Sequence, residues 1–162
     1  MKPFFTLLCL FALLSCTPKF TPTETVPTGD NTEAAGNMEE SILRYINAHR
    51  RSKGLGTLQM SNVASAQAYQ HSKNMATGKT GFGHDGFDQR VQAIKQAMGV
   101  TYMSASAENV AYGQLSAQAV VKGWLNSAPH KKNIEGNYTL TGIGIYKDRK
   151  GIIYFTQIFL RK

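Results

Sequence analysis

The chain has 162 residues, 42% of them hydrophobic and 17% charged, with a formal net charge of +8 at pH 7. The length allows one domain with a proper core, and the composition favours a globular domain over a disordered or membrane-spanning chain. Residues 38–162 hold 16 Lys and Arg against 7 Asp and Glu. No repeat of basic and aromatic residues accompanies this surplus, so we expect no nucleic-acid partner.

The first sixteen residues have the layout of an export signal. Lys2 gives a positive start, residues 4–14 form a short apolar run, and the small Ser15 precedes Cys16. The apolar run is too short to span a bilayer comfortably. We therefore interpret it as a signal peptide rather than a membrane helix.

Residues 13–16, with the sequence Leu-Leu-Ser-Cys, resemble the lipobox of bacterial lipoproteins. The resemblance implies that residues 1–15 are a lipoprotein signal peptide, removed together with Cys9, and that Cys16 carries an acyl anchor such as palmitate. Thr17, rather than Asp, follows the cysteine, which favours the outer membrane if the source is Gram-negative. The alternative is an ordinary signal peptide in which Cys16 stands by chance.

The stretch after Cys16 is rich in Thr, Pro and small polar residues and has almost nothing to bury. We expect residues 16–37 to be the lipidated cysteine and a flexible tether, and residues 38–162 to be the folded domain. The positive charge of a domain outside the cell suits lipid headgroups or acidic wall polymers, or it only aids solubility. This domain contains no cysteine, so it has neither a disulfide nor a catalytic thiolate.

Apolar residues spaced three or four apart predict four helices, over residues 39–53, 62–77, 86–98 and 117–126. Asn62 is the expected cap of the second helix, and Gly99 ends the third. Residues 140–146 and 152–160 then alternate around a polar turn, which predicts a β-hairpin buried on both faces. Helices first and a hairpin last indicate an α+β domain whose helices cover the sheet.

Four segments carry residues suited to chemistry: the Gly-rich loop 82–86, and residues 107–111, 124–134 and 154–157. Glu108 stands among Ala and Val, and a carboxylate buried there must be paired or hydrogen-bonded. His130 follows Pro129, which suits the first turn of a short helix. A helix N-terminus favours the neutral imidazole, the form that binds metal or accepts a proton.

The remaining polar and aromatic residues of these segments are expected to be structural. We predict that Trp124 lies in the core and that Tyr154 and Gln157 are ordinary sheet residues. Asn109 and Asn133 are expected to satisfy loop backbone groups near a cleft, and we interpret His49 and His71 as packing or surface residues.

In their order along the chain, the strings G-H-D, A-E-N-V-A-Y-G, W-x-x-S-x-x-H-x-x-N-I, T-G-I-G-I-Y and Y-F-T-Q-I-F resemble the bacterial branch of the CAP superfamily. This is the group of cysteine-rich secretory proteins, antigen 5 and pathogenesis-related 1 proteins, whose domain is also called SCP. The resemblance covers residues 39–160. It implies a three-layer α-β-α sandwich with a small antiparallel sheet, and a cleft with two histidines and acidic residues in which some members bind zinc.

The resemblance makes His84 and His130 the cleft histidines and Glu108 the cleft acid. Many eukaryotic members have a second Glu after the first His, where this chain has only Asp85 and Asp88. His84, Glu108 and His130 are thus candidate ligands of a zinc site with an open fourth position. The competing interpretation is a hydrogen-bonded cluster that only braces the cleft, with Glu108 accepting from two donors.

Three functions remain open on the sequence alone. The favoured one is a binding module for a lipid or cell-envelope ligand that uses the His/Glu cleft, because CAP relatives are associated with binding sterols, fatty acids and other extracellular partners. A metal-dependent hydrolase or peptidase is the second. It lacks a clear nucleophile, since Ser127 has only one His nearby in sequence, and we assign no catalytic residue. The third is a surface interaction protein without a small ligand.

Overall fold

The computed structural model describes residues 35–162, with side chains from Met38 onward. Nine elements follow one another along this part of the chain: α1 (Ala35–Ser52), β1 (Gln59–Met60), α2 (Asn62–Ala76), α3 (Phe87–Ala97), β2 (Ala105–Tyr112), α4 (Ala117–Asn126), α5 (Ala128–Ile134), β3 (Leu140–Lys147) and β4 (Ile153–Arg161). The predicted signal peptide, Cys16 and most of the predicted tether lie outside the described residues. Within the described part, no helix is long and apolar enough to cross a membrane.

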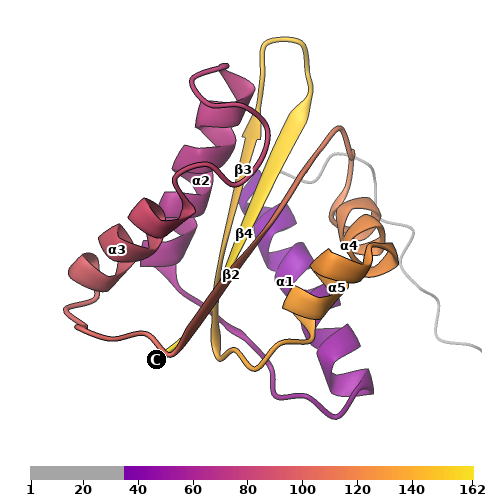
Figure 1. The fold of residues 1–162 in the computed structure, drawn as a ribbon. Coiled ribbons are helices and arrows are strands. Elements are labelled where there is room, and N and C mark those ends of the chain that lie inside the picture. Colours follow the sequence, from indigo (N-terminus) through magenta and orange to yellow (C-terminus); the bar gives the residue numbers. More distant parts are fainter. Residues whose placement is uncertain (1–34) are drawn as a thin grey trace, which may run out of the picture.

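The four strands form one sheet in the order β1-β3-β4-β2. Strand β4 pairs antiparallel with both β3 and β2, while the short β1 pairs parallel with β3. Helices α2 and α3 cover one face of the sheet, and α1, α4 and α5 cover the other (Figure 1). The predicted α+β, three-layer α-β-α architecture is therefore confirmed. The sheet is mixed rather than purely antiparallel because β1 joins its edge.

Glycines on β3 allow α2 to lie directly against the sheet. A side chain built at Gly142 or Gly144 would overlap the backbone of α2 between Ala64 and Tyr69. On the helix side, Ala64 and Ala68 are fully buried, so small residues meet small residues across this contact. The close approach fixes α2, and with it the loop that follows, against the sheet.

The central strand β4 is buried on both faces, as the sequence predicts. Phe155 and Phe159 pack with α1 and α4 around Trp124, and Ile158 and Leu160 pack with α2 and α3. Each buried aromatic side chain of this kind stabilises the fold by about 1.5–3 kcal/mol. Two separate clusters thus hold the helical layers onto one sheet, and Trp124 is a core residue as expected.

Several element boundaries differ from the predictions. Helix α1 begins at Ala35, inside the segment predicted as tether. Ser61, not Asn62, caps α2, because the Ser61 hydroxyl accepts a hydrogen bond from the backbone N–H of Ala64. Strands β1 and β2 were not predicted. Strand β2 has a polar pair, Glu108 and Asn109, at its centre, which masks the usual strand pattern.

Candidate functional site

Glu108 lies at the centre of the edge strand β2 and is only 6% exposed. Its neighbour Ala107 belongs to the core on the α1–α4 side, so the Glu108 side chain points to the opposite face, toward α2 and α3. A carboxylate in such a position must be hydrogen-bonded or paired to remain charged. The structure supplies its partners from two different segments.

The first partner is Arg90 on α3, whose guanidinium holds both carboxylate oxygens of Glu108. Its Nε donates to Oε2 at 2.9 Å and its Nη2 donates to Oε1 at 2.8 Å. Its Nη1 also donates to the backbone oxygen of Asp85 at 2.8 Å, which ties the Gly-rich loop to the same group. The Arg90 side chain is 10% exposed, so this two-pronged ion pair is largely shielded from water.

The second partner is His84 on the Gly-rich loop. Its Nδ1 lies 3.0 Å from Glu108 Oε1. A carboxylate already paired with a guanidinium accepts only, so Nδ1 carries the proton and donates. The His84 side chain is nevertheless 54% exposed. The ring is therefore held in place on one side and open to solvent on the other.

His71 lies beneath this pair, on α2, and is 1% exposed. Its Nε2 donates to the backbone oxygen of Gly83 at 2.8 Å and lies 3.8 Å from Glu108 Oε1. Its Nδ1 is buried without a hydrogen-bond partner. Burial is the main cause that lowers the pKa of His71, because a proton on Nδ1 would have no acceptor. His71 is thus a neutral support for the loop that carries His84.

His130 lies on α5, across the edge strand from Glu108, and is half-buried. Burial lowers the pKa of His130, and the nearby His84 lowers it further. The direction agrees with the predicted tendency toward neutral imidazole, but its causes are burial and His84 rather than the helix N-terminus.

Two asparagines fasten α5 to the strand. Asn109 donates to the backbone oxygen of His130 at 3.1 Å. Asn133 donates to the backbone oxygen of Glu108 at 3.2 Å and to the side-chain oxygen of Asn109 at 2.9 Å. Both residues bond backbone groups beside the site, as predicted, but those groups belong to α5 and β2 rather than to loops. The bonds set the position of His130 relative to Glu108.

The residues as placed do not fit a metal ion. Arg90 and His84 already take up both oxygens of Glu108, and the His84 nitrogen nearest to them bears a proton. Within the described part of the chain, no group of three or more His, Cys, Asp or Glu side chains is arranged to hold a metal. Asp85 and Asp88 are exposed and do not supply a second buried acid. Zinc binding by His84, Glu108 and His130 stays a prediction.

Sequence reasoning missed Arg90, and it identified His71 as a packing residue without its place beside Glu108. The expectation that a buried Glu108 needs a partner was sound, but the partner could only be identified once α3 and β2 were known to meet. His71 was interpreted as a packing or surface residue, and it is buried against the site. His49 lies elsewhere, paired through Nε2 with Glu135 Oε1 at 2.9 Å.

Comparisons with known proteins agree with this arrangement. Residues 43–159 match the CAP family, described as the cysteine-rich secretory protein family. The chain is 34% identical over 131 residues to the uncharacterized protein YkwD of Bacillus subtilis, covering 76% of this chain and 47% of the relative. It is 32% identical over 127 residues to the uncharacterized membrane protein YlbC of the same organism, covering 76% of this chain and 34% of the relative. The chain thus spans about half or less of the length of these curated relatives.

Two solved structures show the same fold. An extracellular SCP-domain protein of Bacillus anthracis has 27% identity and a TM-score of 0.63, over 81% of this chain and 45% of that one. An outer surface protein of Borrelia burgdorferi has 21% identity and a TM-score of 0.69, over 80% of this chain and 97% of that one. The family match extends over most of the described residues. The chain therefore belongs to the CAP family of cysteine-rich secretory proteins.

Proposed function

We propose that this chain is an exported, lipid-anchored binding domain of the cell envelope that does not hydrolyse its ligand. The observation that carries the proposal is that the carboxylate of Glu108 is buried and already hydrogen-bonded within the chain. Its two oxygens are held by the chain's own Arg90 and His84, and the residue is 6% exposed. A general base or a metal ligand needs an oxygen free to meet the reacting group, whereas each oxygen of Glu108 already accepts a hydrogen bond from the chain itself.

The two imidazoles are the groups left to meet a ligand. His84 exposes more than half of its side chain, and His130 is half-buried across the edge of β2. The first ring is oriented by Glu108, and the backbone of the second is held by Asn109. A ring fixed like that of His84 recognises a polar group at little entropic cost, which suits binding a lipid headgroup or a wall fragment.

Export and anchoring rest on the N-terminal segment together with the relatives. Residues 1–15 have the layout of a lipoprotein signal and precede Cys16. The Bacillus anthracis relative is named an extracellular protein, and the Borrelia relative an outer surface protein. These names support a place for the chain outside the cytoplasm, and the anchor at Cys16 rests on the sequence of residues 1–16 alone.

Binding can be tested with two probes, a muramidase digest of peptidoglycan and a total bacterial lipid extract. The chain from Thr17 onward, which keeps every described element, is incubated with each probe, and retained material is identified by mass spectrometry. We expect wild type to retain a component that His84→Ala loses. His49→Ala is the matched control, because His49 also pairs with a glutamate but lies away from the site.

Two outcomes would overturn the proposal. If wild type and His84→Ala retain the same probe components equally, the His/Glu cleft is not the binding site. Chemical cleavage of either probe by wild type, lost in Glu108→Gln with the fold intact, would favour the hydrolase instead. Anchoring is tested separately: Cys16→Ala in the full chain should move the protein from the membrane fraction to the soluble fraction.

A further inference from the structure

A row of aromatic side chains crosses the sheet where the strands approach the β3–β4 turn. Tyr146, Tyr154 and Tyr112 are direct neighbours across three strands. The rings of Tyr112 and Tyr154 are stacked with centroids 5.7 Å apart, and Phe82 contacts Tyr112 edge-on at 4.8 Å. At the other end of the row, Tyr69 contacts Tyr146 edge-on at 5.9 Å. Five rings thus lie in a row, in which Tyr146 and Tyr154 are cross-strand neighbours and the other adjacent rings are in contact.

The strip is only partly covered: Tyr69 itself lies on α2, which ends at Ala76 beside Tyr146, and Tyr146 and Tyr154 are half-buried. Phe82 is 53% exposed and Tyr112 52%, and both belong to no buried cluster among the described residues. Leu115, in the loop directly after β2, is 75% exposed at the same end of the sheet. Large apolar side chains gathered at one end of a domain mark an interaction surface rather than scattered surface residues.

Positive charge adjoins the strip. Lys147, Arg149 and Lys150 are exposed on the turn that joins β3 to β4. A recess of about 440 Å³ beside this turn is lined by Arg149, Lys150 and the ring of Tyr146. Asp148 also lines the recess, but its Oδ1 accepts from the backbone N–H groups of Lys150 and Ile152 and so braces the turn. Excess positive charge around a recess suits a phosphate-bearing ligand.

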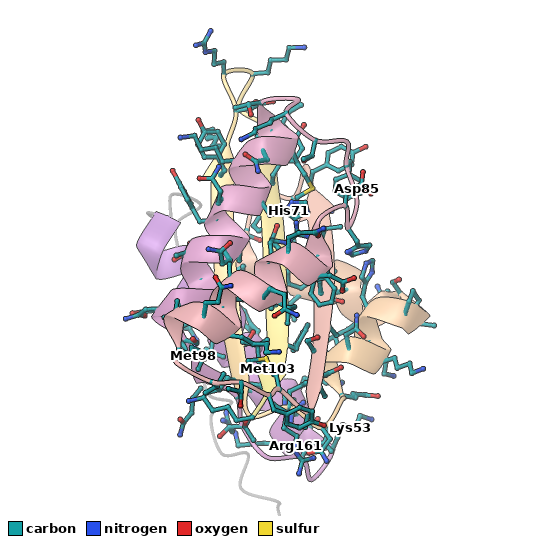
Figure 2. All side chains as sticks on the ribbon, turned by 60° about the vertical axis from the view of Figure 1, so that its left-hand side comes forward. Lys53, His71, Asp85, Met98, Met103 and Arg161 are labelled. Atoms are coloured by element: carbon teal, nitrogen blue, oxygen red, sulfur yellow. The ribbon has the colours of Figure 1, made fainter. Side chains whose placement is uncertain are left out.

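The N-terminal part of α1 lies toward the end of the domain that carries the β3–β4 turn. The carboxylate of Glu39, in the second turn of α1, accepts a hydrogen bond from the backbone of Ile145, near the turn. The other end of α1 lies far away, where Arg50 donates to the backbone oxygens of Ile134 and Gly136. Figure 2 places Lys53 at the end of the molecule opposite to the β3–β4 turn. A tether that ends at α1 therefore joins the domain nearer to the turn than to the opposite end, so the turn is within reach of the membrane.

We propose that this end, the tip surface, docks onto an anionic lipid bilayer. The tip surface comprises Phe82, Tyr112, Leu115, Tyr146, Lys147, Arg149, Lys150 and Tyr154. Its rings and Leu115 enter the headgroup region, where Tyr is favoured, and its three cations contact lipid phosphates. The proposal rests on the proposed function in one respect, the anchor at Cys16, which sets which end faces the membrane.

Vesicle binding tests the proposal without the anchor. The chain from Thr17 onward is sedimented with vesicles of phosphatidylcholine alone or mixed with phosphatidylglycerol. We expect binding to the mixed vesicles that weakens with salt. Neutralising Lys147, Arg149 and Lys150 together to Ala should reduce it roughly a hundredfold, from the contribution of each cation near an anionic surface. The matched control is Arg51→Ala/Lys53→Ala/Lys162→Ala, which removes the same charge elsewhere.

A second variant, Phe82→Ser/Leu115→Ser, tests the apolar part and should weaken binding that survives high salt. Equal losses in the tip and control variants would show non-specific charge attraction and overturn the proposal. No binding to mixed vesicles, or retention on a phosphate-bearing wall polymer instead, would also overturn it. Release by Cys16→Ala is a separate readout, so a failed anchor and a failed tip surface are told apart.

Discussion

Removing the charge of Arg90 is the most direct test of how the site is built. Arg90→Met keeps much of the apolar stem but leaves Glu108, with a side chain 1% exposed, without a cation. Removing one partner of a buried ion pair costs about 3–5 kcal/mol, because the other charge is left without compensation. We expect about 3 kcal/mol, the low end, since His84 still donates to Glu108 and Arg90 itself is 10% exposed.

A double-mutant cycle separates the pair from its surroundings. Free energies of unfolding are measured by urea denaturation at pH 7 for wild type, Arg90→Met, Glu108→Gln and the double variant. Two groups in contact should give a coupling energy of about 1–3 kcal/mol, so the double variant is more stable than additive effects would make it. A cost below about 1 kcal/mol for Arg90→Met, together with additivity, would refute the buried ion pair and make the contact equivalent to a surface salt bridge.

Three further outcomes follow from the structure. Gly144→Ala should cost about 1–3 kcal/mol or more because its Cβ would overlap the α2 backbone, while Gly123→Ala, with open space around it, should cost nothing; thermal unfolding checks both. Because burial lowers the pKa of His71, the unfolded chain takes up the proton first, so stability should fall as the pH drops below about 6.5; His71→Asn should flatten that dependence in urea titrations at pH 7 and 5. After dialysis against micromolar zinc, elemental analysis should find no stoichiometric zinc in wild type. A stoichiometric amount that is lost in His130→Ala would instead establish the ligand set predicted from sequence.

The elements that the sequence predicted best are those whose pattern is local. The face of α1 that carries Ile42 and Ile46 and the hairpin around Gly151 both follow from residue spacing, and both are confirmed. Strand β2 was missed because both of its faces meet protein, so buried polar residues replace the alternating pattern. Glu108 alone, a carboxylate among small apolar residues, signalled that something at this strand required a partner.

Arg90 could not be identified as that partner from sequence, because its role depends on a tertiary contact between α3 and an unpredicted strand. On α3 the periodic apolar face, which includes the fully buried Ile94, predicts only how the helix packs. An arginine beside that face is ordinarily interpreted as a solvated charge. Its guanidinium reaches Glu108, at the centre of the edge strand β2, only because the fold brings α3 over this face of the sheet.

The guanidinium of Arg90 also explains why the site has no second buried acidic residue beside Glu108. Two carboxylates facing two histidines would need an outside cation to offset their charge. This site has one buried carboxylate, Glu108, and one guanidinium, Arg90, and these two offset each other within the chain. With no net charge to compensate, a second acid would be a liability, and Asp85 and Asp88 are accordingly exposed. The charge of the buried Glu108 is therefore balanced by a group of the chain itself, and the ring of His84 faces outward, with its side chain 54% exposed.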